Sequence, residues 1–202
     1  MHAMKAVGSA ATLALGVLAL APTDALAQDC YMSTSVYLAS GYTPVEYSRD
    51  AGATWSPAHV VAPWFTYDVI PGTSYINYQP STDGVAQTWT DYRTSFYVPP
   101  LPPGSRSFNR RLTLEVHADN VAWAFLDGST SPFFQQPWTH LESNFQGAPE
   151  TQTLYISEGH HDLRFSVFNH DLQTALDFRV VVEEQICEPC DPRQRICEAQ
   201  PL

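Results

Sequence analysis

The chain has 202 residues, of which 44% are hydrophobic and 15% are charged, and its formal net charge at pH 7 is −11. Lys5 is the only lysine. Binding to nucleic acid or to an anionic membrane surface depends on clustered Lys and Arg, so the composition excludes nucleic acid as an expected partner. Neutral glycans, cations and basic partners stay compatible with this charge.

Residues 1–27 have the three parts of a secretory signal peptide. Lys5 lies near the start, an apolar run covers 10–21, and Ala25-Leu26-Ala27 precedes Gln28. We therefore expect a secreted protein, located in the periplasm, at the cell surface or outside the cell. No later segment approaches the roughly 20 apolar residues of a spanning helix, so no membrane span is expected. The predicted domains are a β-sandwich over 28–186 and a Cys-containing tail over 187–202.

The mature chain is predicted to be all-β. Short runs of β-branched and aromatic residues alternate with polar ones, and Gly, Pro, Asn and Asp separate the runs. The candidate strands are 31–39, 45–47, 75–77, 88–98, 111–117, 121–126, 151–156, 161–169 and 175–184. Nine strands of this kind favour a sandwich of two sheets.

Three candidate strands alternate strictly between apolar and polar residues, which assigns their faces. The core-facing sets are Leu112, Leu114 and Val116; Leu163, Phe165 and Val167; and Leu176, Phe178, Val180 and Val182. His117 falls in the opposite phase, so it is predicted to lie on the surface side of its strand.

Residues 111–117 and 121–126 are predicted to form a packed hairpin. The second run is apolar nearly throughout, so it is expected to be covered on both faces. Asp119 and Asn120 lie between the two runs, where they are expected to brace the turn by hydrogen bonds to nearby backbone. Asp127-Gly128 closes the second run.

Four cysteines remain after export, and an even number in a secreted chain indicates disulfides. Three pairings are open. We favour Cys30 with Cys187, which would tie the first strand to the end of the last, and Cys190 with Cys197 across a small loop. A redox-active Cys-x-x-Cys would need a βαβ context that is absent, and a zinc site would need a second close pair.

Residues 48–74 and 130–149 are long irregular stretches and the expected functional loops. The first contains 48–55, which matches the Ser-x-Asp-x-Gly-x-Thr-Trp pattern called an Asp-box. Sialidase-like propellers contain several copies of this motif. Only one copy occurs here, so we interpret it as a structural turn.

The candidate binding surface comes from aromatic residues in these stretches, because flat rings with a polar rim stack on sugars. The selected residues are Trp64, Tyr67, Trp138 and His140. The alternative interpretation is that such rings close the open ends of the sandwich.

No motif indicates catalysis or a metal site. The chain lacks a Gly-x-Ser-x-Gly elbow, a His-Glu-x-x-His zinc motif, a phosphate-binding loop and a dinucleotide fingerprint. A carboxylate pair for glycoside cleavage would leave no sequence spacing and stays open. His160 and His161 are adjacent, so on a strand they would point to opposite faces and could not easily share one ion. A turn before a strand is the preferred interpretation.

Four motifs together carry a resemblance to a known family. They are Tyr92-Arg93-x-x-Phe96, Leu114-x-Val116-x-Ala118-Asp119-Asn120, Phe125-Leu126-Asp127-Gly128 and Gly159-x-x-x-Leu163-x-Phe165-x-Val167-x-Asn169. In this order they resemble the galactose-binding-domain-like jelly rolls of secreted bacterial proteins, over residues 75–182. The resemblance implies a two-sheet antiparallel sandwich that binds glycans or surfaces, with its first and last strands close together. Asp127 stands where the family commonly has Asn, and no ligand residue carries over.

The sequence therefore predicts a secreted, non-catalytic binding module for a carbohydrate or another cell-surface component. The alternative is a structural subunit of the cell surface or of an extracellular fibre, which self-associates through edge strands or through the tail. No cofactor is expected, although the acidic loops leave structural calcium as a third option.

Overall fold

The computed structural model describes residues 28–62, 70–136 and 148–189, and every regular element in them is a strand. The strands are β1 (Gln28–Ala39), β2 (Glu46–Ser48), β3 (Ser56–Pro57), β4 (His59–Val60), β5 (Ile76–Asn77), β6 (Thr88–Val98), β7 (Arg106–Asp119), β8 (Val121–Leu126), β9 (Phe134–Gln135), β10 (Glu150–Tyr155), β11 (Gly159–Asn169) and β12 (Ala175–Pro189). Among these residues, no helix is long and apolar enough to cross a membrane.

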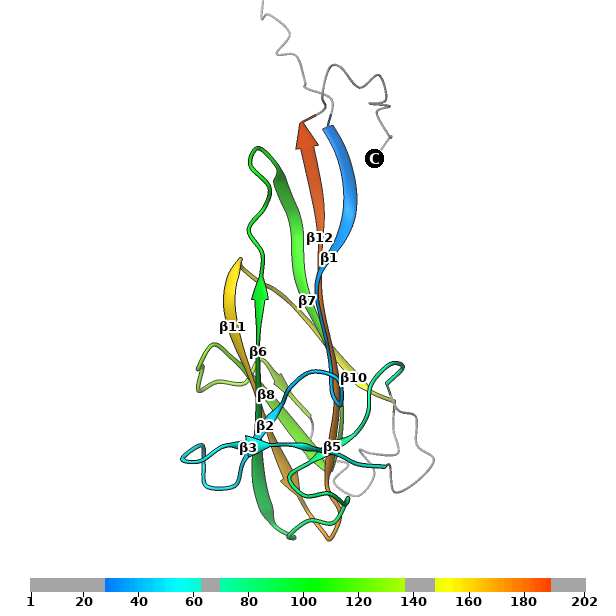
Figure 1. Ribbon diagram of the computed structural model, residues 1–202, viewed down its shortest axis with the longest axis vertical. Helices are drawn as coiled ribbons and strands as arrows, with labels where there is room; N and C mark the ends of the chain where they lie inside the picture. Colours follow the sequence, from blue (N-terminus) through cyan, green and yellow to red (C-terminus); the bar gives the residue numbers. More distant parts are fainter. Residues whose placement is uncertain (1–27, 63–69, 137–147, 190–202) are drawn as a thin grey trace, which may run out of the picture.

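The strands form two antiparallel sheets that pack face to face (Figure 1). Sheet A has the order β10-β7-β12-β5-β4, and β1 also pairs with β12. Sheet B has the order β3-β2-β6-β11-β8-β9. The predicted two-sheet, all-β fold is confirmed. The short strands β3, β4 and β9 lie inside stretches that were expected to be irregular.

Strand alternation builds the core as predicted, because the three assigned core-facing sets are almost completely buried. Phe165 of sheet B and Phe178 of sheet A face each other with ring centroids 4.7 Å apart. A fully buried Leu, Val or Phe contributes about 1.5–3 kcal/mol relative to an exposed one. The shared interior therefore fixes which face of each strand is buried and which face points away from the core.

The predicted hairpin between residues 111–117 and 121–126 is wrong. β7 pairs with β10 and β12 in sheet A, whereas β8 pairs with β9 and β11 in sheet B. Their connection thus crosses from one sheet to the other. The expected bracing of a hairpin turn by local hydrogen bonds falls with it. Asn120 Oδ1 instead accepts a hydrogen bond from the His170 N–H at 2.7 Å, 50 positions along the chain, and the Asn120 N–H donates to the Phe168 carbonyl at 3.1 Å. Alternation assigns faces, but it does not choose the partner strand.

β1, β7 and β12 extend beyond sheet B and form the arm at the top of Figure 1. The predicted disulfide between Cys30 and Cys187 is confirmed, with an S–S distance of 2.02 Å, and it joins β1 to β12 in this arm. At the base of the arm, the buried Glu184 carboxylate accepts from Ser107 Oγ at 2.5 Å and from Arg110 Nε at 2.7 Å. Cys190 and Cys197 lie outside the described residues.

Part of the outer face of sheet A is covered by the chain itself. The N–H of Ile70 donates to the Asp177 Oδ2 at 2.9 Å, and Ser40 Oγ donates to its Oδ1 at 2.8 Å. His117 was predicted to lie at the surface, yet it is only 1% exposed, and its Nδ1 lies 2.7 Å from the Tyr75 hydroxyl. The surface prediction fails because the side chain of Tyr75, which precedes β5, lies against His117 on this face.

Candidate functional site

The structure does not test the binding surface that was predicted from aromatic residues of the sequence. Trp64, Tyr67, Trp138 and His140 lie outside the described residues. A binding platform built from them therefore stays a prediction. The candidate site in the described part of the chain comes from other residues, on the outer face of sheet B.

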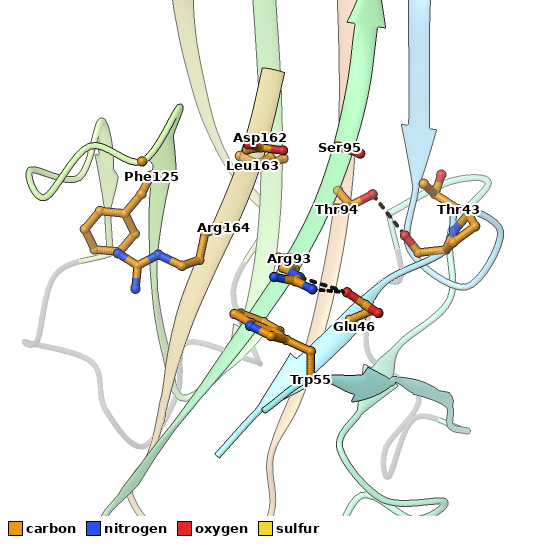
Figure 2. Close-up of a pocket in the computed structure, with 12 residues that line it drawn as sticks. Thr43, Glu46, Trp55, Arg93, Thr94, Ser95, Phe125, Asp162, Leu163 and Arg164 are labelled. Carbon is orange, nitrogen blue, oxygen red and sulfur yellow. Dashed lines mark hydrogen bonds and ion pairs between the residues drawn. The ribbon is translucent and has the colours of Figure 1, made fainter. Parts of the chain in front are cut away.

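That face carries a trough of about 670 Å³, drawn in Figure 2. β6 and β11 provide its floor. Trp55, which precedes β3, and Glu46 of β2 form one wall, and Phe125 of β8 forms the other. The volume falls in the range of small-molecule sites, which is about 300–1,000 Å³.

The floor is polar because of strand phase. In β6 the inward residues Tyr92 and Thr94 are buried, so Arg93 and Ser95 point outward. The antiparallel register places Arg164 of β11 directly opposite Arg93, and Asp162 opposite Ser95. Two arginines and one carboxylate thus meet on one small area of the sheet.

Arg93 is held by one wall of the trough. Its guanidinium pairs with Glu46 Oε2, at 2.8 Å from Nε and 2.7 Å from Nη2, and it lies 4.1 Å from the Trp55 ring centroid. Both charged side chains are almost half exposed, so the ion pair itself contributes at most about 1 kcal/mol to stability. Its main effect is to fix the direction of the Arg93 donors.

Arg164 is held by the opposite wall. Its guanidinium lies 4.2 Å from the Phe125 ring centroid, and its Nη1 is 3.6 Å from Asp91 Oδ1. Like charges directly opposite on a sheet repel each other. Figure 2 shows the two arginines turned apart, Arg93 toward Glu46 and Arg164 toward Phe125. The trough lies between them.

The Asp-box turn delivers Trp55 to the trough. Asp50 Oδ1 accepts from the Thr54 N–H at 2.9 Å, Oδ2 accepts from Thr54 Oγ1 at 2.6 Å, and Ser48 Oγ donates to Oδ1 at 2.7 Å. These bonds, with the Thr54 hydroxyl first, lower the pKa of Asp50 to about 2. Gly52 has φ +85°, and its carbonyl accepts from Trp55 Nε1 at 3.0 Å. The structural-turn interpretation is confirmed, and the turn also aims an indole at the site.

The wall at Phe125 is anchored by a buried histidine. His161 Nδ1 lies 2.9 Å from Asp127 Oδ2, and His161 Nε2 lies 3.0 Å from the Ser157 carbonyl. Both partner atoms are acceptors, so both contacts are hydrogen bonds only when each ring nitrogen carries a proton. Asp127 also accepts from the Asp162 N–H at 3.0 Å, which ties the turn after β8 to β11.

The expected turn at 160–162 is wrong, because these residues belong to β11. The predicted opposition of the two imidazoles is confirmed: His160 is exposed on the outer face, whereas His161 is 5% exposed. In the described ranges, no group of three or more His, Cys, Asp or Glu side chains could hold a metal ion.

Sequence reasoning missed the residues of the trough. They are Glu46, Arg93, Phe125, Asp162 and Arg164. One signal was available, since Arg93 and Arg164 occupy the polar phase of two strands in a chain with few cations. That the two arginines face each other follows from register, which a local pattern does not give.

No known protein family matches this chain, and no curated protein is similar to it in sequence. A similar solved structure is a family 35 carbohydrate binding module from Clostridium thermocellum. It is 10% identical, the alignment covers 76% of this chain and 97% of that chain, and the TM-score is 0.36. At this similarity the comparison assigns no family to the chain.

Proposed function

We propose that the protein is a secreted, non-catalytic module that binds a neutral carbohydrate in the trough of sheet B. The observation that carries the proposal is that charged donors and charged acceptors line one exposed trough between two aromatic walls. The Cys30–Cys187 disulfide supports an oxidising compartment. The sequence contains no catalytic motif that would favour an enzyme.

The mixture of donors and acceptors favours hydroxyl groups. Arg93 and Arg164 can only donate hydrogen bonds, whereas ionised Glu46 and Asp162 can only accept them. Each sugar hydroxyl does both, so neighbouring hydroxyls on one ring can use an arginine and a carboxylate at the same time. The apolar C–H groups of a sugar ring can contact the partly exposed Trp55 indole at one wall, whereas the Phe125 ring at the other wall is 6% exposed and holds the Arg164 guanidinium in place.

Charged ligands fit this trough less well. An anionic ligand would meet the carboxylates of Glu46 and Asp162 and a protein with a net charge of −11. A cationic ligand would meet two arginines. A neutral ligand avoids both repulsions, and we expect its affinity to change little between low and high salt.

The test is binding of the disulfide-bonded protein to an array of neutral and charged glycans, followed by calorimetry on the best neutral oligosaccharide. Arg164→Gln is expected to weaken binding at least about tenfold, because it removes a charged donor. Arg111→Gln is the matched control. Arg111 also stacks on a ring, that of Tyr155 at 5.3 Å, but it lies on sheet A outside the trough.

Three results would reject the proposal. One is an array on which no neutral glycan binds. Another is equal loss of affinity in the Arg164 and Arg111 variants, which would separate binding from the trough. The third is a steep fall in affinity with added salt, which would indicate a charged ligand.

A further inference from the structure

A second aromatic feature lies on the same outer face of sheet B, beyond the trough. Tyr97 of β6 and His160 of β11 are directly opposite in register, and their ring centroids are 4.8 Å apart. Tyr97 is 49% exposed and His160 is also exposed, so neither ring closes the core. Their inward neighbours Phe96 and Val98 are buried and do that.

The two features share one continuous floor. β6 and β11 pair over their whole length without a register shift, unlike the pairings of β12 with β1 and β7. Tyr97 follows Arg93 by four residues, which corresponds to about 13 Å along a strand. A single sugar ring is shorter than this distance. Between the two features, Ser95 and Asp162 are exposed and polar.

We propose that Tyr97 and His160 form a second subsite, so that the ligand is an extended oligosaccharide lying along β6 and β11. This inference rests on the proposed function. Trp55 and Phe125 each carry an arginine on the ring, whereas in the described part of the chain no arginine stacks on Tyr97. A phenol ring with a polar rim and no stacked cation is suited to the apolar face of a sugar.

The ligand therefore has two contacts of different kinds. Hydroxyl groups of one unit bind the charged side chains around Arg93 and Arg164, and a later unit of the same chain contacts the Tyr97 ring. Affinity should rise with chain length until both subsites are filled, and then level off. A ligand of two units fills the trough alone.

The experiment measures the affinity of the disulfide-bonded protein for β-1,4-linked gluco-, xylo- and manno-oligosaccharides of two and six units. For the series that binds, we expect about tenfold tighter binding of the six-unit ligand. Tyr97→Ala should abolish this gain and leave the affinity for the two-unit ligand unchanged. Tyr155→Ala is the matched control, because Tyr155 is an exposed tyrosine on sheet A.

The outcomes separate this inference from the proposed function. If none of the three series binds at either length, the extended site is wrong, and the proposed function is rejected only if the array also shows no bound neutral glycan. If both lengths bind equally and Tyr97→Ala has no effect, the trough works alone and the second subsite is wrong. If Tyr97→Ala weakens both lengths equally, Tyr97 supports the trough itself, and the extended site is again overturned. Circular dichroism of each variant verifies that it is folded.

Discussion

Strand alternation places polar side chains on the outer faces of both sheets, but these side chains are covered on sheet A and exposed on sheet B. On sheet A, Asp177 and His117 point outward from the core, but the segment around Ile70 and Tyr75 covers them. On sheet B, Arg93 and Arg164 also point outward, yet they remain exposed to solvent in a trough. Strand alternation produces both sets of polar side chains. The covering segment decides which set is buried and which set stays exposed to solvent.

The two faces also differ in how much each polar contact stabilises the fold. A buried donor or acceptor left without a partner costs about 1–3 kcal/mol, whereas an exposed ion pair contributes at most about 1 kcal/mol. Substitutions on sheet A should therefore change stability, and substitutions on sheet B should change binding.

The largest effect is expected from removing the disulfide that closes sheet A. Cys30 and Cys187 are separated by 157 residues, and cross-linking a loop of this length stabilises a fold by about 4–5 kcal/mol through the unfolded chain. Replacing both residues by Ser should lower the free energy of unfolding in urea by about this amount. Glycan affinity of the folded fraction should be unchanged, since the disulfide lies in the arm. An unchanged urea midpoint would contradict the prediction.

The next effect compares one aspartate from each face. Asp177→Ala leaves the buried Ile70 N–H without its acceptor and should cost about 3 kcal/mol in urea unfolding. Asp162→Ala, at an exposed position of the trough, should change stability by about 0.5 kcal/mol or less but weaken glycan binding. If the two variants unfold at the same urea concentration, the proposed division between the faces is wrong.

A smaller effect should appear as a pH dependence. Burial, reinforced by the negative charge of Asp171, raises the pKa of Asp119 to about 7, from 3.8 in a free side chain. The folded protein therefore binds more protons than the unfolded chain between these values, so this group makes stability fall as pH rises from about 4 to 7 and then level off. In Asp119→Asn this fall should be absent, a difference of about 1–2 kcal/mol because water still reaches part of the carboxyl.

The measurement is urea unfolding of wild type and Asp119→Asn at several pH values. Asp171→Asn serves as the intermediate variant, because it removes the smaller of the two causes and should reduce the slope without abolishing it. Parallel stability curves for wild type and Asp119→Asn would show that Asp119 titrates alike in the folded and unfolded chains.

The last prediction concerns the turn that carries Trp55. Gly52 has φ +85°, so Gly52→Ala should strain the turn by about 1 kcal/mol, displace the indole and weaken glycan binding several-fold. Gly104→Ala provides the matched control: Gly104 has φ +87° but lies between β6 and β7, away from Trp55. Equal glycan affinities of the two variants would show that Trp55 does not contribute to binding.

The features that the sequence predicted correctly depend on interactions between residues close together in the chain. Alternation is local, so strands 88–98 and 121–126 and the three core-facing sets were predicted correctly. The Asp-box is also local, and its turn forms as expected. Partner choice is not local. For that reason the 111–126 hairpin was wrong, and the covering of His117 could not be anticipated.

The trough is the clearest case of information held in long-range pairing. Arg93 and Arg164 are 71 positions apart in the chain, and each alone resembles an ordinary solvent-facing strand residue. Only the β6–β11 register places one opposite the other, and only the crossing of β8 into sheet B supplies the ring of Phe125. The apolar–polar alternation along a single strand indicates neither the register nor the crossing.

The arm determines where the domain can be attached to a surface or to a neighbouring domain. Gln28 and Pro189 are paired at its tip, where both ends of the described domain emerge together (Figure 1). A label, surface or neighbouring domain attached at either end would therefore pull on the same disulfide-joined pair of strands, while the face of sheet B that holds Arg93 and Arg164 stays unobstructed. Mounting the protein by one end or the other should present the same face to a passing ligand.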